Sequence, residues 1–453
     1  MVVNKALILA AGIGKRMNSP RPKVAHEILG KPMINWVIDA AMMAGINEIG
    51  VVVGHGSEIV SSMISDRVKI FVQRNQLGTA DAVKAGRDFL DGKIIVLYGD
   101  VPLISNDTIS SLMKVDGDMI VLTTRLENPA GYGRIVRKNG KFVRIVEEVD
   151  ATDDVREIDE INTGIYAFDS KALIYALDRI KNENKKAEYY LTDAVEILLE
   201  AGYDVKAVRS DDPPAVLGIN TQRELSSLSK IVRERINGAL MDSGVTIEDP
   251  DTTFIGPDVV VEAGALIKPF TFIYGKSKVS KNSVIGPETT LVDTFVGTGS
   301  TVLRSDCNGA TVGTNCTVGP FSRLRPGATL EDHVKIGNYV EVKNSHLFNG
   351  VKAQHLTYLG DATVGEETNI GAGTITCNYD GVNKNKTFIG KNVFVGSNTA
   401  LVAPVTVGDG ALVGAGSTIT EDVPAYALAL GRARQVNKEE WVLKKRRGKP
   451  DEK

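Results

Sequence analysis

The sequence predicts an α/β chain in which a parallel sheet covered by helices is followed by a parallel β-helix. Two observations predict this fold class. In the first half, short apolar runs of strand length alternate with stretches of helical spacing. In the second half, an aliphatic residue recurs every six positions and glycine becomes frequent, since residues 1–245 hold 20 glycines and the shorter stretch 246–432 holds 24. The chain therefore changes structural class near residue 245.

Five short apolar runs in the first half are predicted strands. They are Ala6–Ala10, Ile49–Val53, Lys69–Gln73, Ile94–Tyr98 and Met119–Thr124. Helical stretches between them, such as Met33–Ala44, imply a parallel sheet covered on both faces. Ligands of such sheets bind beyond the carboxyl ends of the strands. The loops Ala11–Lys23 and Gly99–Pro102 follow two of these ends and are the candidates for a binding site.

A single long helix is predicted after the sheet, over Thr221–Met241. Its apolar residues recur three and four positions apart, at Leu225, Leu228, Ile231, Val232, Ile236 and Leu240. We therefore expect four segments: a first domain over 1–220, a linker helix over 221–245, a β-helix domain over 246–432 and a tail over 433–453. The tail carries the basic run Lys444–Arg447, which is typical of a solvated chain end.

A sixfold aliphatic repeat defines the second half. It runs through Ile255, Val261, Ile267, Ile273, Val279, Ile285, Leu291, Val296, Val302, Val312, Val318, Leu330, Ile336, Val342, Val364, Ile370 and Thr376, and then through Ile389, Val395, Leu401, Val407, Val413 and Ile419. This period is neither helical nor that of a simple alternating strand. It is the signature of a hexapeptide parallel β-helix, in which one side chain per short strand points inward. Glycine often follows the aliphatic position and suits the tight corner there.

Two interruptions of the repeat are candidates for a functional site. One lies at 343–363, where the phase slips, and contains His355 and Tyr358. The other places twelve residues, 377–388, between two repeat positions. Insertions in a solenoid become loops on one face, often the binding face. A tolerated surface loop is the alternative interpretation, and two polar interruptions close together favour a site.

Composition excludes several classes of protein. Lys plus Arg is 53 and Asp plus Glu is 56, which argues against binding nucleic acid through bulk positive charge. The three cysteines, Cys307, Cys316 and Cys377, form no CxxC pair, so neither a disulfide framework nor a zinc site is expected, and a reducing, cytoplasmic location fits best. No apolar run approaches the roughly 18 residues of a membrane span. The run Ala6–Ala11 is too short for a signal peptide and is soon followed by basic residues.

A glycine-rich turn directly after the first predicted strand is a candidate phosphate site. It reads Leu9-Ala-Ala-Gly12-Ile-Gly14-Lys-Arg-Met17. Its small residues let backbone N–H groups approach phosphate oxygens, while Lys15 and Arg16 supply positive charge. It matches neither the Walker A motif nor GxGxxG, and a plain tight turn is the alternative. Pro22-Lys23 adds a further cation downstream.

Polar residues at other predicted strand ends are candidate ligands. Asp100, in Tyr98-Gly-Asp100, is placed to hold Mg²⁺ against phosphates, with a helix cap or turn as the alternative. Gln73 and the segment Leu77-Gly-Thr79 could read the edge of a base. Gly131-Tyr-Gly-Arg134, Glu147 and Asn162-Thr-Gly164 add polar groups that, taken singly, are typical of a protein surface.

Three cations stand out in the β-helix, where charge is otherwise sparse. Arg323, Arg325 and Lys343 could hold a phosphate. His355 lies nearby in the sequence, so a proton acceptor and an anion clamp could share one site. A lone histidine is more often structural, and that alternative stays open on the residues alone.

The motifs together resemble a known family of bifunctional enzymes. The first half resembles sugar-nucleotide pyrophosphorylases in its Leu9-Ala-Ala-Gly12-x-Gly14 loop, Pro22-Lys23 pair, Leu77-Gly-Thr79 segment and Tyr98-Gly-Asp100 corner. The second half resembles hexapeptide acyltransferases. Three blocks, Arg323–Gly327, His355–Asp361 and Asn369–Gly381, resemble those of the bacterial bifunctional N-acetylglucosamine-1-phosphate uridyltransferases/glucosamine-1-phosphate acetyltransferases. The likeness runs from about Leu7 to Arg432, and it implies a Rossmann-like nucleotidyltransferase domain and a left-handed β-helix.

For the first domain, the resemblance implies uridylyl transfer from UTP to N-acetylglucosamine 1-phosphate. The implied substrate-binding residues are Leu9, Ala10, Ala11, Gly12, Lys23, Gln73, Gly78, Thr79, Tyr98, Gly99, Asp100, Gly133, Glu147, Asn162 and Asn220. Among these, Ala10, Gln73, Gly78 and Thr79 are implied to hold uridine, and Gly133, Glu147 and Asn162 the sugar. Arg16 and Lys23 are implied to act on the triphosphate, and Asp100 and Asn220 to bind Mg²⁺.

For the second domain, the resemblance implies acetyl transfer from acetyl-CoA to glucosamine 1-phosphate. His355 is the implied general base. Arg325, Lys343, Tyr358 and Asn369 are implied to hold the sugar phosphate, and Ala372, Asn378, Tyr379, Ser397, Ala415 and Arg432 to hold acetyl-CoA. The resemblance also implies a homotrimer, with acetyl sites shared between chains.

One motif departs from the family pattern. The family's loop commonly reads G-x-G-T-R-M, whereas Lys15 replaces the threonine here, and Ile13 stands where lysine is common. A cation is thus kept but shifted by two positions. Two rival interpretations are a pyrophosphorylase of single activity whose β-helix only oligomerises it, and a non-catalytic scaffold. His355 and the Asn378-Tyr379 segment argue against the first, and the set of Lys23, Asp100 and Asn220 argues against the second.

Overall fold

The computed structural model describes residues 4–64 and 68–447. The chain divides into two compact units, Met1–Val232 and Arg233–Lys453. Helix α9 (Gln222–Asp242) carries the chain from one unit into the other, and its ends agree with the predicted helix to within one residue.

A mixed sheet, nine-stranded over the described residues, forms the centre of the first unit. Its main path runs through β11 (Val205–Arg209), β7 (Met119–Arg125), β10 (Glu160–Asp169), β6 (Lys93–Tyr98), β1 (Asn4–Ala10), β4 (Glu48–Val53) and β5 (Lys69–Val72). The hairpin of β8 (Arg134–Lys138) and β9 (Lys141–Val146) is attached to β10. All five predicted strands are confirmed, as β1, β4, β5, β6 and β7.

The expectation of an all-parallel sheet is wrong at β10. This strand runs antiparallel to both of its neighbours, β6 and β7. The chain enters β10 after the β8–β9 hairpin rather than through a crossover helix, and only a crossover returns a strand in the parallel sense. Strands β1, β4, β5 and β6 are parallel to one another, so their carboxyl ends share one edge of the sheet.

Helices cover both faces of the sheet, as predicted. Successive residues of β1 point to opposite faces, so Ala6 and Ile8 join one apolar core and Leu7 and Leu9 join the other. The first core includes residues of α1 (Met33–Met43), α2 (Ser57–Met63), α4 (Asn106–Lys114) and α8 (Pro213–Val216). The second includes residues of α3 (Thr79–Ala85), α6 (Ser170–Leu177) and α7 (Ala194–Glu200).

The first unit also contains short elements. They are η1 (Lys15–Met17), η2 (Lys23–Ala25), β2 (Glu27–Ile28), β3 (Lys31–Pro32), η3 (Arg87–Phe89), α5 (Asp153–Arg156) and η4 (Leu191–Asp193).

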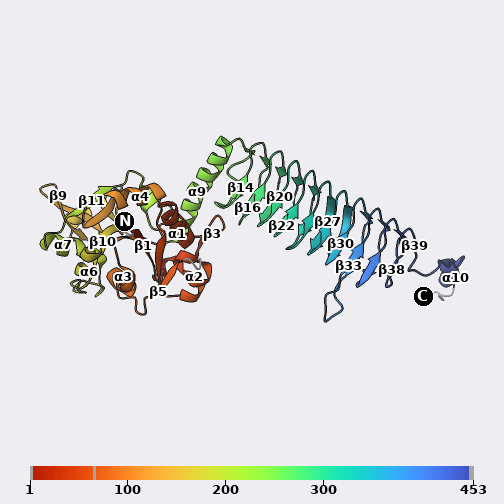
Figure 1. The fold of residues 1–453 in the computed structure, drawn as a ribbon, viewed down its shortest axis with the longest axis horizontal. Helices are drawn as coiled ribbons and strands as arrows, with labels where there is room; N and C mark the ends of the chain where they lie inside the picture. The colour runs from red at the N-terminus through yellow and green to blue at the C-terminus, as the bar shows by residue number, and fades with distance from the viewer. Residues whose placement is uncertain (1–3, 65–67, 448–453) are drawn as a thin grey trace, which may run out of the picture. The chain divides into compact units, whose positions relative to one another are not determined.

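The second unit is a coil of short parallel strands with three faces (Figure 1). The first face holds β12 (Thr246–Ile247), β15 (Leu266–Ile267), β18 (Val284–Ile285), β21 (Thr301–Val302), β24 (Thr317–Val318), β31 (Asn369–Ile370), β34 (Phe394–Val395), β37 (Leu412–Val413) and β39 (Leu428–Ala429). The second face holds β13 (Phe254–Ile255), β16 (Thr271–Tyr274), β19 (Thr289–Val292), β22 (Asp306–Asn308), β25 (Arg323–Leu324), β32 (Ile375–Cys377), β35 (Ala400–Val402) and β38 (Thr418–Ile419). The third face holds β14 (Val260–Val261), β17 (Lys278–Val279), β20 (Phe295–Val296), β23 (Thr311–Val312), β26 (Thr329–Leu330), β28 (His346–Leu347), β30 (Ala362–Val364), β33 (Thr387–Ile389) and β36 (Val405–Val407). Strands β27 (Lys335–Lys343) and β29 (Lys352–Gly360) run through the first two faces.

The predicted repeat forms the core of this coil. Its positions from Ile255 to Ile419 are all buried, with at most 7% of their surface exposed. A regular coil takes three hexapeptides, since Ile267 pairs with Ile285, 18 residues later. Cys307 and Leu324 fill core positions that the repeat did not identify.

The two interruptions differ in structure. The first was expected to be a loop, and this is wrong, because residues 352–360 form strand β29 along its neighbour β27. The ladder continues around a corner at Tyr339 and Leu356, whose φ angles are 59° and 41°. The second is confirmed as a loop that extends from the coil between β32 and β33 (Figure 1). A bridge between Tyr379 and Lys384 closes it, and a short helix, α10 (Trp441–Arg447), lies near the end of the chain.

Candidate active sites

The first candidate site is a pocket at the carboxyl ends of β1 and β6. Its volume is about 590 Å³. Twelve of the predicted uridylyl-site residues line it: Leu9, Ala10, Ala11, Gly12, Arg16, Lys23, Gln73, Gly78, Thr79, Tyr98, Asp100 and Asn220. Residues far apart in the sequence are therefore brought together at the edge that the strand pattern predicted.

The glycine-rich turn is held against Lys23. Gly14 has a φ of 65°, and a Cβ there would lie 2.7 Å from Cβ of Lys23. Only glycine tolerates both this backbone and this approach without strain. The turn therefore places Lys23 beside the loop that carries Arg16, so that both cations line the same pocket.

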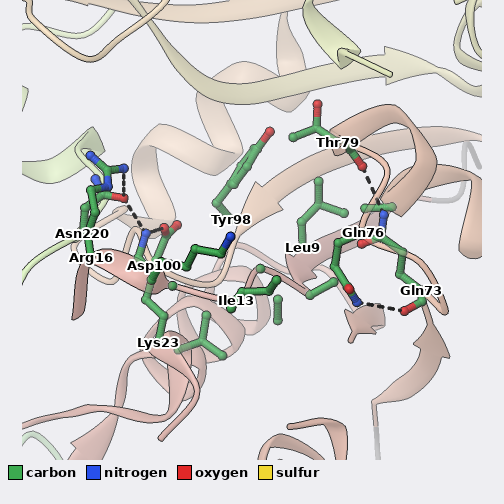
Figure 2. Close-up of a pocket in the computed structure, with 18 of the residues that line it drawn as sticks. Leu9, Ile13, Arg16, Lys23, Gln73, Gln76, Thr79, Tyr98, Asp100 and Asn220 are labelled. Atoms are coloured by element: carbon green, nitrogen blue, oxygen red, sulfur yellow. Dashed lines mark hydrogen bonds and ion pairs between the residues drawn. The ribbon is translucent and has the colours of Figure 1, made fainter. Parts of the chain in front are cut away.

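Lys23, Asp100 and Asn220 form the charged end of the pocket (Figure 2). The Lys23 ammonium forms an ion pair with Asp100 and donates to Oδ1 of Asn220 at 2.7 Å. Arg16 donates to the same oxygen at 2.8 Å. The Asp100 and Asn220 oxygens therefore converge on one point that is filled by a cation.

This arrangement suits a divalent metal ion. Carboxylate and amide oxygens are ligands for hard cations, which often take one or two protein oxygens and complete their shell with phosphate and water. The Lys23 ammonium already stands where such a cation would meet Asp100 and Asn220. Among residues 4–64 and 68–447 no cluster of three or more His, Cys, Asp or Glu side chains is arranged for a metal. A cation held here would therefore depend on the substrate for its remaining ligands.

The opposite end of the pocket presents amide and hydroxyl groups. Figure 2 shows Gln73, Gln76, Thr79 and Leu9 on this side, with Tyr98 between them and the charged end. Thr79 accepts a hydrogen bond from the backbone N–H of Leu191 at 2.9 Å, and it also bonds the Tyr98 hydroxyl. Burial raises the pKa of Tyr98, so its hydroxyl stays protonated at neutral pH. This end offers neutral hydrogen-bonding groups, which suit a base and a ribose better than phosphates.

Gly133, Glu147 and Asn162 lie together but do not line this pocket. Backbone N–H of Asn162 donates to the Gly133 carbonyl at 2.8 Å, and a Cβ at Gly133 would lie 3.5 Å from Oε1 of Glu147. Burial raises the pKa of Glu147, while a hydrogen bond from Thr192 at 3.3 Å opposes that rise. The three residues therefore form a polar group outside the pocket.

Gly99 is predicted to bind substrate but does not line the pocket, and some residues that line the pocket are not predicted. Gly99 packs closely, and a Cβ there would lie 2.8 Å from Cδ1 of Ile34. Gln76 and Glu188 line the pocket but were not predicted. Gln76 follows Gln73 by three residues in the same loop, which was an available signal. Glu188 lies in a segment without a recognisable motif.

The second candidate site is a cluster of cations on the β-helix. Lys384, from the inserted loop, lies beside Lys343 and lowers the pKa of that lysine. Arg325 is nearby and donates to Glu341 at 2.9 Å. Asp361 is the facing carboxylate, held by Asn344 at 2.5 Å and by Asn378. The three cations, Arg325, Lys343 and Lys384, outnumber the two nearby carboxylates, Glu341 and Asp361, and such an excess of positive charge is typical of a site that receives an anion.

The other predicted acetyl-site residues lie on neighbouring coils. His355 and Tyr358 are on β29, and His355 is exposed. Asn369 begins β31, the next strand along that face. Ala372, Ser397 and Ala415 stack on consecutive coils, because a Cβ at Gly371 would meet the Ser397 backbone and one at Gly396 the Ala415 backbone. Arg432 lies next to Gly416, one coil further on.

Two residues of the inserted loop take different positions. Asn378 is buried and donates to Asp361, so it lies with the cation cluster. Tyr379 is exposed, and its hydroxyl donates to the Gly381 carbonyl at 2.6 Å. Lys384 and Asp361 complete the cluster but had been given no role. The loop containing Lys384 was predicted as a site, although nothing distinguished this lysine from its neighbours.

Comparisons with known proteins show the family of each unit. Residues 5–213 match the nucleotidyl transferase family, and residues 309–344 and 386–421 match the bacterial transferase hexapeptide family. The chain is 53% identical over 450 residues to the bifunctional protein GlmU of Thermosipho africanus, covering 98% of each chain. It is 52% identical to that of Fervidobacterium nodosum, covering 98% of each. It is 48% identical to that of Thermotoga maritima, covering 98% of this chain and 99% of the other.

The chain belongs to the GlmU family of bifunctional proteins. Its two units correspond to the two matched families, one for nucleotidyl transfer and one for the hexapeptide transferases. The resemblance found in the sequence and the fold class of a nucleotidyltransferase domain followed by a hexapeptide β-helix are both confirmed. Within the described residues, no helix of this GlmU relative is both long and apolar enough to cross a membrane.

Proposed function

We propose that this chain makes UDP-N-acetylglucosamine in two steps. The β-helix unit transfers the acetyl group of acetyl-CoA to glucosamine 1-phosphate, and the first unit transfers the uridylyl group of UTP to the product. The convergence of Lys23, Asp100 and Asn220 at one end of the pocket, with amide and hydroxyl groups at the other end, supports this function most strongly. Membership of a bifunctional family supports the second activity.

In the uridylyl step, a phosphate oxygen of N-acetylglucosamine 1-phosphate attacks the α-phosphorus of UTP. The new P–O bond forms as the bond to the β-phosphate breaks, and pyrophosphate leaves. No protein nucleophile is needed, so positioning and charge neutralisation supply the catalysis. Lys23 and Arg16 neutralise the triphosphate, while Gln73, Gly78 and Thr79 hold the uridine.

The metal in this proposal is Mg²⁺, held by Asp100 and Asn220. When bound, it neutralises the charge that develops on the departing pyrophosphate. Lys23 holds the oxygens of Asp100 and Asn220 together in the free protein, and it turns toward the phosphates when UTP binds. Gly133, Glu147 and Asn162 orient the acetylated sugar.

In the acetyl step, the sugar amine attacks the thioester carbonyl and coenzyme A leaves as the thiol. His355 takes the proton that the amine loses as the N–C bond forms and returns it to the thiolate as the C–S bond breaks, a contribution usually worth about 10²–10⁴ in rate. Arg325 and Lys343 hold the phosphate of the substrate, together with Tyr358 and Asn369. Ala372, Asn378, Tyr379, Ser397, Ala415 and Arg432 line the path of acetyl-CoA in this proposal.

We also propose the bounds of the domains, the oligomeric state and the order of the two reactions. The uridylyl domain covers 1–220, the linker helix 221–245, the acetyl domain 246–432 and the tail 433–453. The hexapeptide coil suits packing around a threefold axis, and we infer a homotrimer whose inserted loops reach neighbouring chains. Acetylation comes first, because its product is the sugar that the uridylyl site accepts. The substrates and the reduced cysteines suit the cytoplasm.

One product assay tests both activities. The protein is mixed with glucosamine 1-phosphate, acetyl-CoA, UTP and Mg²⁺, and the products are identified by mass spectrometry. UDP-N-acetylglucosamine is the expected product. Accumulation of N-acetylglucosamine 1-phosphate alone would contradict the uridylyl assignment and point to the altered loop at Ile13 and Lys15. Formation of neither product would favour a non-catalytic scaffold, whereas uridylyl transfer to supplied N-acetylglucosamine 1-phosphate alone would favour the single-activity pyrophosphorylase.

A further inference from the structure

The side-chain amide of Gln73 is held in one orientation by two acceptors. Its Nε2 donates to Oδ2 of Asp81 at 2.8 Å and to the backbone carbonyl of Gly78 at 3.1 Å. A carboxylate and a carbonyl can only accept, so the nitrogen of the amide must face them. The Gln73 residue is buried, with 5% of its surface exposed, and its backbone N–H is bonded to Val53 at 2.8 Å.

The carbonyl oxygen of the same amide is left for a ligand. Within residues 4–64 and 68–447, no hydrogen-bond donor lies on Oε1 of Gln73. Gln73 also lines the pocket, on the side opposite the charged end (Figure 2). A buried acceptor of this kind, once the pocket is filled, requires a donor from the bound molecule.

We infer that Asp81 is a positioning residue that sets the choice of base by fixing the Gln73 amide with its oxygen toward N3 of a pyrimidine. This inference rests on the proposed uridylyl function. Uracil carries a proton on N3 and donates it to Oε1. Cytosine has a lone pair on N3, which would face the lone pairs of Oε1 and leave both buried acceptors unpaired.

Without Asp81 the amide can turn over. The rotated amide would set Oε1 against two acceptors in this protein, whereas only the Gly78 carbonyl would oppose that rotation if Asp81 were absent. The rotated amide presents its NH₂ group to the pocket, where it can donate to N3 of cytosine. The effect expected from losing Asp81 is therefore a loss of discrimination between bases rather than a general loss of activity.

Asp81 also lies in the first turn of α3, which suggests a purely structural alternative. An acidic residue there stabilises a helix through its dipole, whatever the pocket contains. Asp107 occupies the first turn of α4 in the same way, and it does not line the pocket. Asp107→Ala is therefore a matched control for the loss of a first-turn charge.

The test compares kcat/KM for UTP and CTP in the full-length protein, with N-acetylglucosamine 1-phosphate and Mg²⁺ as the other reactants. Asp81→Ala is expected to lower the ratio of UTP to CTP by about tenfold or more, the equivalent of about 1.4 kcal/mol. Asp81→Asn has both an acceptor and a donor, so it can pair with either orientation of the Gln73 amide and should also lower the ratio. Asp107→Ala should leave the ratio unchanged.

Three outcomes would overturn the inference. An equal loss with both nucleotides in Asp81→Ala, with acetyl transfer intact, would reduce Asp81 to a structural role. No change in kcat/KM with either nucleotide would mean that Asp81 does not set the choice of base. A wild-type protein that transfers neither uridylyl nor cytidylyl groups would refute the proposed function and, with it, this inference.

Discussion

Replacing Lys23 by Met removes the cation from between Asp100 and Asn220. The Lys23 and Asp100 side chains are 12% and 18% exposed, so the pair is mostly but not fully buried. Breaking a fully buried pair costs about 3–5 kcal/mol and losing an exposed one about 0–1 kcal/mol. We expect a cost of about 2 kcal/mol, which lowers the melting temperature of a unit of this size by about 4–8 °C.

Added Mg²⁺ should reverse much of that loss. In the wild-type protein the metal must displace the Lys23 ammonium from the two oxygens, whereas in Lys23→Met they are free. A ligand present at 100 times its Kd stabilises by about 2.7 kcal/mol. The melting temperature should therefore rise with Mg²⁺ more steeply in the variant than in the wild-type protein.

Calorimetry over a Mg²⁺ series at a fixed concentration of UTP, which supplies the remaining ligands of the metal, measures this difference in melting temperature. Both activity assays accompany it. Lys15→Met is the control, because Lys15 is an exposed lysine of the same loop. Uridylyl transfer in Lys23→Met should fall by about 10²–10³, as expected when one stabilising group is lost, and acetyl transfer should be unchanged. If Mg²⁺ raised the melting temperature of Lys23→Met no more than that of the wild-type protein, Asp100 and Asn220 would not be the metal site.

Three further predictions test other parts of the structure. Asp100→Ala should abolish uridylyl transfer and spare acetyl transfer, whereas His355→Ala should lower acetyl transfer by about 10²–10⁴ and spare uridylyl transfer; loss of both activities in either variant would contradict the assignment. Leu324→Ala should lower the free energy of unfolding of the β-helix by about 2–5 kcal/mol in urea, because Leu324 is fully buried in its core; a loss under 1 kcal/mol would contradict that packing. Burial and the nearby Glu147 raise the pKa of Asp193 to about 6, above the roughly 3.9 of the unfolded chain, so the stability that it contributes is present below pH 4 and is lost as the pH rises through 6. Because Asp193 is partly exposed, we expect Asp193→Asn to reduce this loss by about 1 kcal/mol, and parallel melting curves from pH 4 to 8 would refute it.

Sequence periodicity predicted the β-helix because each sixfold position is a core position. It missed Cys307 and Leu324, since the coil does not always take 18 residues: Ile285 pairs with Val302, 17 residues later. A corner that is one residue shorter shifts the sixfold phase of the sequence, while the strands of neighbouring coils still pair. The same effect explains why the sequence of residues 352–360 predicts a loop although these residues form a strand.

The antiparallel strand β10 could not be predicted in the same way. Its residues from Glu160 to Asp169 mix polar and apolar types, and its pairing with β7 shifts between Asn162 and Tyr166. Neither the helical period nor the alternating period of a strand is kept across such a shift in register.

The residues of a pocket are harder to predict than a strand, because they meet only after the chain has folded. The motifs predicted Lys23 and Asp100 separately, but no sequence spacing indicates that Asn220 accepts from Lys23.

The two sites hold positive charge in different ways, and the difference follows from what each reaction does to a phosphate. In the first unit Lys23 is paired with Asp100, so the free site keeps a carboxylate among its cations. A triphosphate that is cleaved creates new charge on its leaving group, and a carboxylate lets a metal ion be held where that charge appears. In the β-helix, the neighbouring Lys384 and Arg325 lower the pKa of Lys343, and Asp361 only partly opposes this effect. The phosphate of glucosamine 1-phosphate is unchanged by acetylation, so fixed cations are sufficient to hold it. The pairing of Lys23 with Asp100 therefore suits a site that takes a divalent cation with its phosphates, whereas the cations of the β-helix suit direct contact with a phosphate.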